Sequence, residues 1–327
     1  MLYSTLRYLL ALAAQYKLAI FHLDVETAFL NGELEEEIDA FQPEGCKSAK
    51  YPDKVIKLNK ALYGLKQGSR TWNIKLKEIL IIMNFIQLKT DRCVYILEHT
   101  IDHDTKQLIL GTYVDDLILI TNSAYLKKIV LDKHKKQLSM RDLRELKYFL
   151  NIDINYDKEK GILELIQTNY IKSLLKKFNM PECSHRATPL DPFQKLSKYT
   201  QIEDSSQDKT PNFPYQEAVG SILYLSQTTR PDITHAVNML SKYNNCYSNE
   251  HVNAVKHLLK YLQSMKEAKL SLTKKSGRLI GFSDANFAND LHDRKSTSGY
   301  IFYLYNFPIS WKSKKQKCVS TSTCQPE

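Results

Sequence analysis

The chain has 327 residues, of which 43% are hydrophobic and 25% charged, and its formal net charge is +10. This length and apolar content are enough for a large core and for two or three domains. No signal peptide, internal repeat, low-complexity tract or apolar run of about eighteen residues is present, and the six scattered cysteines include no C-x-x-C pair. These features exclude a membrane span and a zinc framework, and favour a soluble chain in a reducing compartment.

Hydrophobic periodicity predicts mixed helices and strands in the first half of the chain. In chain order these are an apolar helix over 6–16, a strand over 17–23 that ends at Asp24, a helix-like segment over 26–30, a helix around Trp72, and short strands over 107–110 and 117–120. Helices over 126–137 and 170–178 flank two alternating strands, 149–156 and 161–166, which turn residues join as a hairpin.

A polar, proline-containing segment over 185–214 is interpreted as a linker. Beyond it the pattern predicts helices over 215–228, 231–243 and 251–265, the second with Pro231 at its first position. From about Arg278 three strands are expected, over 279–284, over 298–304 and from 308 onward.

The most informative stretch is GTYVDDLI, residues 111–118, which places Asp115 and Asp116 at the tip of an expected β-hairpin. Two adjacent carboxylates beside a buried surface repel each other unless a divalent cation lies between them. A bare Asp doublet is more often a solvated turn, because turns favour Asp for backbone reasons. A third acid, Asp24, falls at the end of a strand, and only a fold could bring it to Asp115.

Several motifs, in order and at the expected spacing, resemble the reverse transcriptase of copia-type retrotransposons. They are HLDVETAFLNGELEEEI, LNKALYGLKQGSRTWN, GTYVDDLILIT, FLNIDI, QTNYIKSLLKKFNM, YQEAVGSILYLSQTTRPDITHAVNMLSKY and SDANFANDLHDRKSTSGYIFYL. The resemblance covers essentially the whole chain, and so many motifs in register are far more specific than any one of them.

The resemblance implies that Asp24, Asp115 and Asp116 are the catalytic aspartates and hold two Mg²⁺ ions for in-line phosphoryl displacement. Phe29 matches the aromatic residue that stacks under the incoming sugar and blocks a 2′-hydroxyl. The alternative for Phe29 is a core side chain on the helix face that Val25 shares.

The resemblance also implies a substrate-binding group formed by Tyr63, Gly64, Lys66 and Arg70. Gly64 suits a close approach of the backbone to a ligand, and Lys66 and Arg70 are expected on one helix face. The family usually has Gln-Ser-Pro-Arg where this chain has Gln-Gly-Ser-Arg, residues 67–70. Because Pro is lost and Gly gained, we expect a looser helix entry and a less certain template alignment.

Charge is unevenly distributed: residues 121–180 hold thirteen Lys or Arg against seven Asp or Glu, whereas residues 1–60 hold seven against nine. A basic segment after the hairpin is where a polymerase thumb would hold a duplex by its phosphates. The expected nucleic-acid-binding residues are Lys127, Lys128, Lys133, Lys135 and Lys136. The alternative is a solvated helix face.

Near the end of the chain, Asp284 matches the first metal-binding aspartate of a ribonuclease H fold, and Glu327 falls at the position of its glutamate. The Cys-Gln-Pro-Glu sequence that ends at Glu327 departs from the usual Glu-Ala-Glu. Since the remaining acids of that site are absent, we expect an incomplete site and no ribonuclease H activity.

The expected fold is α+β, a right-hand polymerase palm and thumb followed by a helical connection and a partial ribonuclease H-like sheet. The expected domains are truncated fingers and palm over 1–122, a thumb-like region over 123–184, the linker over 185–214, the connection over 215–275 and the start of ribonuclease H over 276–327. The family's basic finger segment, expected before Leu6, is missing, so capture of the triphosphate is expected to be impaired.

The expected function is therefore RNA-directed DNA synthesis by a nucleotidyltransferase of a retrotransposon Pol polyprotein. The expected partners are an RNA template, a DNA primer, an RNA–DNA hybrid and deoxynucleoside triphosphates, with no membrane. By resemblance the location is intracellular, either cytoplasmic in a virus-like particle or nuclear. The alternative is an inactive retrotransposon remnant that at most binds nucleic acid. The sequence does not determine the primer or the oligomeric state.

Overall fold

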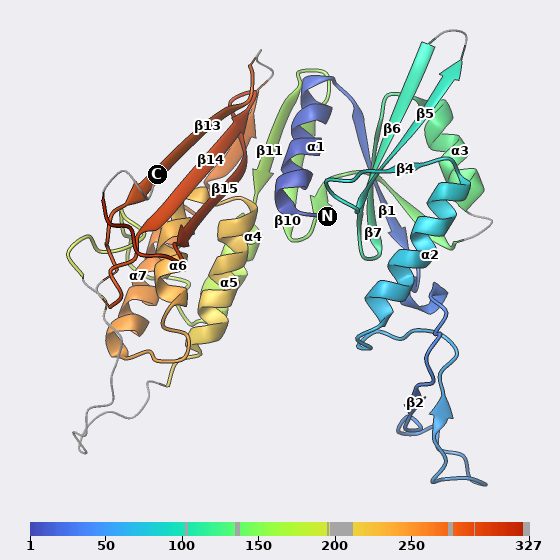
Figure 1. Cartoon of the computed structure of the whole chain (residues 1–327), viewed down its shortest axis with the longest axis horizontal. Coiled ribbons are helices and arrows are strands. Elements are labelled where there is room, and N and C mark those ends of the chain that lie inside the picture. The colour runs from blue at the N-terminus through green and yellow to red at the C-terminus, as the bar shows by residue number, and fades with distance from the viewer. Residues whose placement is uncertain are drawn as a thin grey trace. The chain divides into compact units, whose positions relative to one another are not determined.

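The structure is a computed structural model, and it describes residues 1–101, 104–134, 138–194, 196, 212–273, 277–290 and 292–322. Contacts divide the chain into two compact units (Figure 1). The first unit comprises Met1–Leu2 and Lys17–Leu146, and the second comprises Tyr3–Tyr16 and Lys147–Glu327. The division falls after Leu146, so the expected boundary after residue 122 lies inside the first unit.

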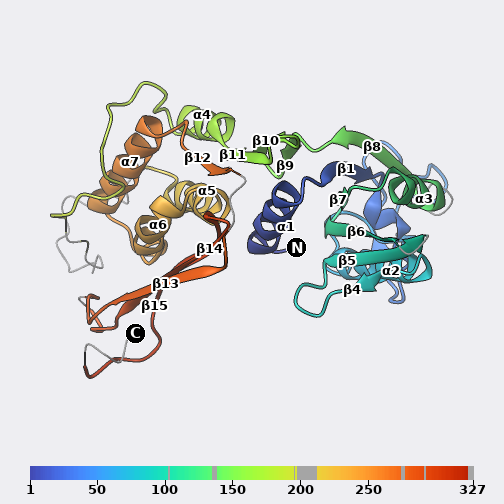
Figure 2. The same cartoon turned by 90° about the horizontal axis from the view of Figure 1, so that it is seen from above.

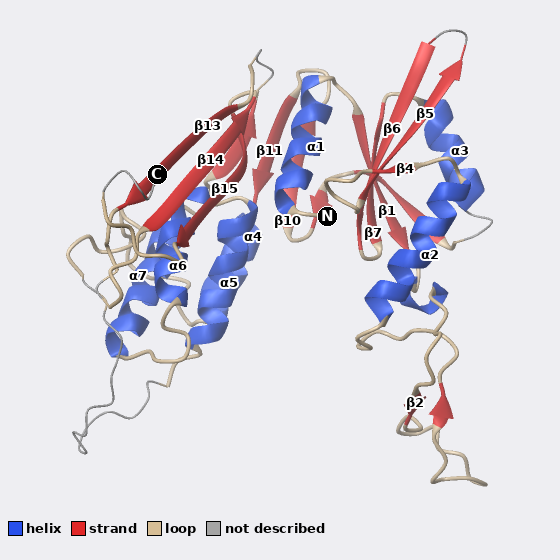
Figure 3. Cartoon of the chain, viewed as in Figure 1, coloured by secondary structure: helices blue, strands red, loops and turns tan. Residues whose placement is uncertain are grey.

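A six-stranded antiparallel sheet forms the centre of the first unit, with strand order β4-β5-β6-β7-β1-β8. Figure 3 colours its strands red and the helices beside it blue. Its strands are β1 (Ala19–Val25), β4 (Ile86–Gln87), β5 (Val94–Ile101), β6 (Asp104–Tyr113), β7 (Asp116–Thr121) and β8 (Met140–Glu145). Strand β7 is central and buried at five of its six positions, which explains why its sequence is a continuous apolar run.

Two helices, α2 (Gly68–Ile82) and α3 (Ala124–His134), pack on one face of this sheet (Figure 2). Their apolar side chains share a core with alternate residues of the strands, such as Leu23, Leu117 and Leu110. Because side chains alternate along a strand, His22, Asp24 and Asp116 lie on the opposite face. The alternation therefore leaves the polar residues of β1 and β7 clear of the two helices.

The segment between β1 and α2 contains a short 3-10 helix, η1 (Ala28–Asn31), and a two-stranded ribbon, β2 (Asp39–Ala40) with β3 (Ile56–Lys57). The expected helix over 26–30 is thus a 3-10 turn that starts later. It packs against α2 at Gly32, where an added Cβ would lie 2.7 Å from Thr71 Oγ1. Glycine is needed there because the two segments approach closely.

The second unit begins with α1 (Tyr3–Gln15) and a four-stranded antiparallel sheet of order β12-β11-β10-β9. Its strands are β9 (Tyr148–Phe149), β10 (Ile152–Asp157), β11 (Ile162–Ile166) and β12 (Lys269–Leu272). The hairpin expected from the turn at 157–161 is confirmed as the β10–β11 pair.

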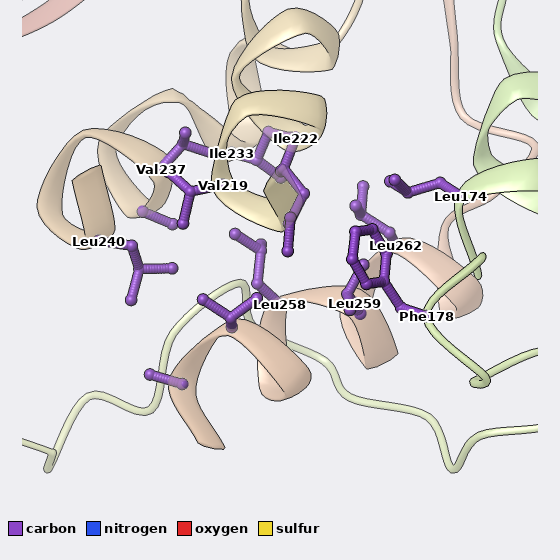
Figure 4. Close-up of a cluster of buried hydrophobic side chains, with 14 of the residues drawn as sticks. Leu174, Phe178, Val219, Ile222, Ile233, Val237, Leu240, Leu258, Leu259 and Leu262 are labelled. Atoms are coloured by element: carbon purple, nitrogen blue, oxygen red, sulfur yellow. The ribbon is translucent and has the colours of Figure 1, made fainter. Parts of the chain in front are cut away.

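Four helices form the largest core of the second unit: α4 (Thr168–Lys177), α5 (Tyr215–Thr228), α6 (Thr234–Ser241) and α7 (Asn249–Ser264). The turn η2 (Pro231–Ile233) precedes α6. Figure 4 shows their side chains converging, among them Leu174, Ile222, Val237 and Leu258. The described ends of the expected linker also pack on this core, through Leu190, Leu196 and Phe213, so this segment does not separate two units.

A three-stranded antiparallel sheet closes the second unit: β13 (Ile280–Asn286), β14 (Thr297–Leu304) and β15 (Phe307–Lys315). The buried Arg7 of α1 connects this sheet to α5. Its guanidinium donates to the carbonyl oxygens of Gln227, Thr228 and Ile309 at 2.7, 2.8 and 2.9 Å, and lies 3.8 Å from the ring centre of Trp311. Burial lowers the pKa of Arg7 to about 9.

Candidate active site

Strands β1 and β7 bring two of the three expected aspartates together. In their antiparallel register Asp24 is the direct cross-strand partner of Asp116, at the end of both strands. Directly paired residues in such a ladder have neighbouring side chains on the same face. The structure therefore places Asp24 beside Asp116, although ninety-two residues separate them in the sequence.

Asp115 occupies the turn between β6 and β7. Tyr113 pairs with Asp116, so Val114 and Asp115 are the two residues of the hairpin loop. The hairpin itself was expected, but only Asp115 lies in its turn, whereas Asp116 is the first residue of β7. The backbone N–H of Val25 donates to the carbonyl oxygen of Asp115 at 2.9 Å. This bond attaches the turn to the end of β1, next to Asp24.

The three carboxylates influence one another electrostatically. Burial raises the pKa of Asp24, and the charges of Asp116 and Asp115 raise it further, while Arg141 and His22 oppose the shift. Like charges disfavour the ionisation of a neighbouring acid, and a cation placed between them would relieve this repulsion. Such a cluster in a polar surface is a candidate for chemistry.

Two protein side chains already contact these acids. His22 Nε2 lies 2.7 Å from Asp116 Oδ1, and the Tyr63 hydroxyl donates a long hydrogen bond of 3.4 Å to Asp115 Oδ2. Burial raises the pKa of Tyr63, as does the negative charge of Asp115. Sequence reasoning missed the role of His22, although its position two residues before Asp24 in a strand places both on the same face.

Phe29 and Tyr63 lie against each other beside the aspartates, with ring centres 4.4 Å apart. Phe29 belongs to η1 and is 9% exposed, whereas Tyr63 is 55% exposed. Phe29 also belongs to the hydrophobic core of the sheet and α2, which is the alternative given for it above, and its contact with an incoming sugar stays a prediction.

The remaining expected substrate residues lie around the start of α2. Gly64 has a φ of 97°, a conformation that favours glycine. Lys66 and Arg70 are both exposed, but α2 begins only at Gly68. The expectation that Lys66 and Arg70 share a helix face is therefore wrong, because Lys66 lies in the turn before the helix.

Packing explains why this chain has Gly68 where the family usually has another residue. Gly68 is buried, and an added Cβ would lie 3.1 Å from the carbonyl oxygen of Leu62 and 3.8 Å from the Phe29 ring. Glycine thus allows the turn before α2 and Phe29 to pack closely on the first residue of the helix. The helix entry is close-packed here, in contrast to the loose entry that we expected.

Of the five expected basic residues, the structure describes the side chains of Lys127 and Lys128. Lys127 lies on α3, where its ammonium contacts Asp142 at 2.9 Å and sits 3.7 Å from the ring centre of Phe21. Lys128 is exposed on the same helix. The side chain of Lys133, together with Lys135 and Lys136, lies outside the described residues. Moreover, residues 121–146 belong to the first unit and 147–180 to the second, so the net charge counted over 121–180 combines two units.

Asp284 lies on β13, opposite Gly299 of β14. It lines a cavity of about 310 Å³ between the sheet and the start of α6, together with His235 and Phe282. Glu327, the other expected ribonuclease H acid, lies outside the described residues.

A second acidic position, Asp290, has the opposite surroundings. It is 9% exposed, and its carboxylate accepts from Lys242, the residue that follows α6, at 3.1 Å and from Lys315 of β15 at 2.7 Å. Burial alone would raise the pKa of Asp290, but Lys315, the His292 backbone N–H and Lys242 together hold it well below its usual range. This carboxylate is neutralised by the protein itself.

Among the described residues, no group of three or more His, Cys, Asp or Glu side chains is placed so that it could hold a metal ion by itself. The carboxylates at the hairpin are nevertheless of the chemical type that Mg²⁺ takes as ligands. Mg²⁺ is usually held by one or two carboxylates together with substrate phosphates and water, and Asp24, Asp115 and Asp116 form a like-charged cluster that a cation would relieve.

No helix in the described part of the chain is long and apolar enough to span a membrane.

Comparison with known proteins gives the family. A family model described as reverse transcriptase (RNA-dependent DNA polymerase) matches residues 1–192.

Curated relatives agree with this match. The chain is 37% identical to the Retrovirus-related Pol polyprotein from transposon TNT 1-94 of Nicotiana tabacum, over 99% of this chain and 24% of that protein. It is also 37% identical to the transposon RE1 polyprotein of Arabidopsis thaliana, over 99% of this chain and 21% of that protein. A putative transposon Ty5-1 protein of Saccharomyces cerevisiae is 30% identical, over 91% of this chain and 94% of that protein.

The chain thus spans less than a quarter of the two plant polyproteins, and nearly all of the yeast protein. The family match covers more than half of the chain and includes the β1 and β6–β7 segments that carry the three aspartates. The chain belongs to the reverse transcriptase (RNA-dependent DNA polymerase) family of copia-type retrotransposons.

Proposed function

We propose that this chain catalyses RNA-directed DNA synthesis and that Asp24, Asp115 and Asp116 form its nucleotidyl-transfer site. The observation that carries the proposal is the register of β1 and β7, which pairs Asp24 with Asp116 next to the Asp115 turn. The raised pKa of Asp24 supports it, because the acids face one another.

The three carboxylates would hold two Mg²⁺ ions, with their remaining coordination positions filled by triphosphate and water. When bound, these ions would activate the primer 3′-hydroxyl and offset the charge of the departing pyrophosphate. The chain's own contribution is alignment. Asp24 and Asp116 are fixed by the β1–β7 ladder, and Asp115 by the bond from Val25 N–H to its carbonyl.

The incoming deoxynucleoside triphosphate would lie over Phe29 and beside Tyr63. Because Phe29 is held in the core, its ring is a rigid surface against which a sugar 2′-hydroxyl would clash. Gly64 allows the backbone to approach the nucleotide or template, and exposed Lys66 and Arg70 provide positive charge on either side of the start of α2. Tyr63 would release Asp115 when a cation binds.

In this proposal the first unit is the palm with part of the fingers, and the helices of the second unit are the thumb and connection. The β13–β15 sheet with Asp284 is the beginning of a ribonuclease H-like domain, to which we assign no activity. An RNA template paired with a DNA primer would be held through its phosphates, with Lys128, and Lys133, Lys135 and Lys136, as candidate contacts.

Primer extension on a homopolymer RNA template tests the proposal. The purified chain should extend a DNA primer in Mg²⁺, and the Asp115→Asn variant should not. Equal extension by both proteins would show that the activity comes from a contaminant. Absence of extension by the wild-type chain over a range of Mg²⁺ and Mn²⁺ concentrations would contradict the proposal.

A second candidate is an inactive relative that retains nucleic-acid binding. It is favoured by one observation: two of the three aspartates already contact protein side chains, His22 and Tyr63. This alternative predicts salt-dependent binding of an RNA–DNA hybrid without extension of the primer.

A further inference from the structure

The tip of the β6–β7 hairpin holds a β-branched residue in a backbone conformation that favours glycine. Val114, the first of the two turn residues, has a φ of 57°. A β-branched residue at positive φ is a true outlier, and it persists only where the surrounding structure holds it. Since the Val114 side chain is 40% exposed, its packing is a weak anchor, and the turn must be held largely through its backbone.

The indole of Trp72 holds the backbone of this turn. Trp72 is 2% exposed and belongs to the core that α2 forms with the sheet. Its Nε1–H donates to the carbonyl oxygen of Val114 at 2.7 Å. The next carbonyl, that of Asp115, accepts from Val25 N–H at 2.9 Å. Two consecutive carbonyls of the turn are thus held by two different elements, α2 and the end of β1.

We propose that Trp72 is a positioning residue for the aspartate hairpin: its indole N–H holds the strained Val114 peptide and so sets the direction of the Asp115 carboxylate. The catalytic consequence of this inference rests on the proposed function. The hydrogen bond by which Trp72 holds the turn does not depend on it. The peptide that joins Val114 to Asp115 carries the carbonyl held by Trp72. A rotation of this peptide would turn Asp115 away from Asp24, and metal ligands tolerate errors of only about 0.5 Å.

The chain provides a matched control. Its only other tryptophan, Trp311 of β15, also donates its indole N–H to a backbone carbonyl, that of Ser226, at 2.7 Å. Trp72→Phe and Trp311→Phe each remove one such bond and keep an aromatic ring. If only Trp72→Phe changes the hairpin, the change is therefore due to the place of Trp72 beside the turn and not to the loss of an indole hydrogen bond in general.

The first measurement is amide hydrogen exchange of the full-length chain, followed by mass spectrometry of peptides that cover residues 111–118. Trp72→Phe should speed exchange in this segment by roughly fivefold to tenfold, the effect of one net hydrogen bond, and Trp311→Phe should leave it unchanged. Unchanged exchange in Trp72→Phe would overturn the proposal. Equal acceleration in both variants would also overturn it, because the effect would then be general loosening.

The second measurement is Mn²⁺ affinity, followed by the electron paramagnetic resonance signal of the free ion. Trp72→Phe should weaken binding by roughly fivefold to tenfold, while Trp311→Phe should bind as the wild type does. Adding Val114→Gly to Trp72→Phe should recover about threefold of the loss, because glycine adopts positive φ without strain. No recovery would overturn the assigned role of the strained peptide.

The outcomes also separate this inference from the proposed function. If the wild-type chain neither extends primers nor binds Mn²⁺, the proposed function fails, and hydrogen exchange still decides whether Trp72 holds the turn. If exchange accelerates in Trp72→Phe while Mn²⁺ affinity is unchanged, Trp72 pins the turn without positioning Asp115, and the proposal is overturned.

Discussion

Asp24 in the first unit and Asp290 in the second are carboxylates in opposite surroundings. Asp24 faces two other acids, and burial together with their charges raises its pKa. Asp290 is more enclosed, yet Lys315, the His292 N–H and Lys242 lower its pKa in spite of the burial. The protein neutralises one charge and leaves the other without a countercharge of comparable effect.

The difference separates a structural carboxylate from one that is available to a ligand. Asp290 joins the end of α6 to β15 through Lys242, which follows α6, and Lys315, so its charge is used within the fold. The raised pKa of Asp24 means that its charged form lowers stability, a cost that the proposed function explains by the binding of an external cation. Variants at the two positions should therefore have opposite effects on stability and activity.

The largest effect is expected for Asp24→Asn. Removing a charge and a proposed metal ligand should reduce primer extension by about 10²- to 10³-fold or more. At pH 7 the same change relieves repulsion, so the thermal midpoint should rise by roughly 1–3 °C. Mg²⁺ should stabilise the wild type and not this variant. A variant that is less stable and still active would remove the contrast with Asp290.

Asp290→Asn should do the reverse. It leaves Lys242 and Lys315 without their shared carboxylate, and we expect a loss of roughly 1–3 kcal/mol in the unfolding free energy of the second unit. Urea unfolding followed by the fluorescence of Trp311, in a Trp72→Phe background, measures this loss. Primer extension by Asp290→Asn below its midpoint should equal that of the wild type.

The pH dependence sharpens the contrast. A lowered pKa means that the folded state binds the proton of Asp290 less tightly than the unfolded chain does. Its contribution to stability is therefore complete above the unfolded pKa of about 3.9 and is lost as the pH falls toward the folded value. The difference in thermal midpoint between wild type and Asp290→Asn should be constant from pH 7 to 5 and should shrink below about pH 4. A difference that grows on acidification would show that the sign is wrong.

A smaller effect is expected at Phe29, beside the uncompensated acids. Phe29→Ala should mainly lower discrimination against ribonucleotides, by about tenfold, since a hydrophobic contact of this size contributes 1–3 kcal/mol to specificity. The ratio of kcat/KM for a deoxynucleotide and its ribonucleotide measures this. Because Phe29 also belongs to the core, the thermal midpoint will fall as well, and assays should be run well below it.

The smallest effect is expected for two lysines of α3 that differ in their pairing within the protein. The Lys127 ammonium already contacts Asp142 and the Phe21 ring, whereas the structure gives exposed Lys128 no ion pair within the described residues. Lys128→Gln should reduce the slope of log affinity against log salt for an RNA–DNA hybrid by up to about 0.9, and Lys127→Gln should leave it unchanged. An equal change in both slopes would mean that an internal ion pair does not remove a lysine from phosphate binding.

Much of the local structure was predictable from the sequence. The helices that begin at Tyr215 and near Asn249 and the hairpin around Asp115 follow from periodicity and turn residues. The pairing of Asp24 with Asp116 was expected only through the family resemblance, because strand register across ninety residues has no local signature.

Other features depend on long-range contacts that no sequence window contains. The bond from Trp72 to Val114 joins residues forty-two positions apart, and periodicity identified Trp72 only as part of a helix. Likewise, Lys127 looked like a free phosphate contact because its partner Asp142 lies on a different element. The placement of α3 in the first unit likewise depends on its packing against β6 and β7 of the six-stranded sheet.

The second unit is discontinuous in the chain, since its first segment, Tyr3–Tyr16, precedes residues 17–146 of the first unit and the rest of it follows them. The acceptors of Arg7, on α5 and β15, are synthesised more than two hundred residues later. During synthesis, α1 therefore leaves the ribosome before α5 and β15, with which Arg7 bonds, have been made. The second unit can be completed only after residues 17–146 have been synthesised. A polypeptide of residues 17–146 should consequently fold alone, whereas one that begins at residue 147 should require α1 to be supplied as a separate peptide.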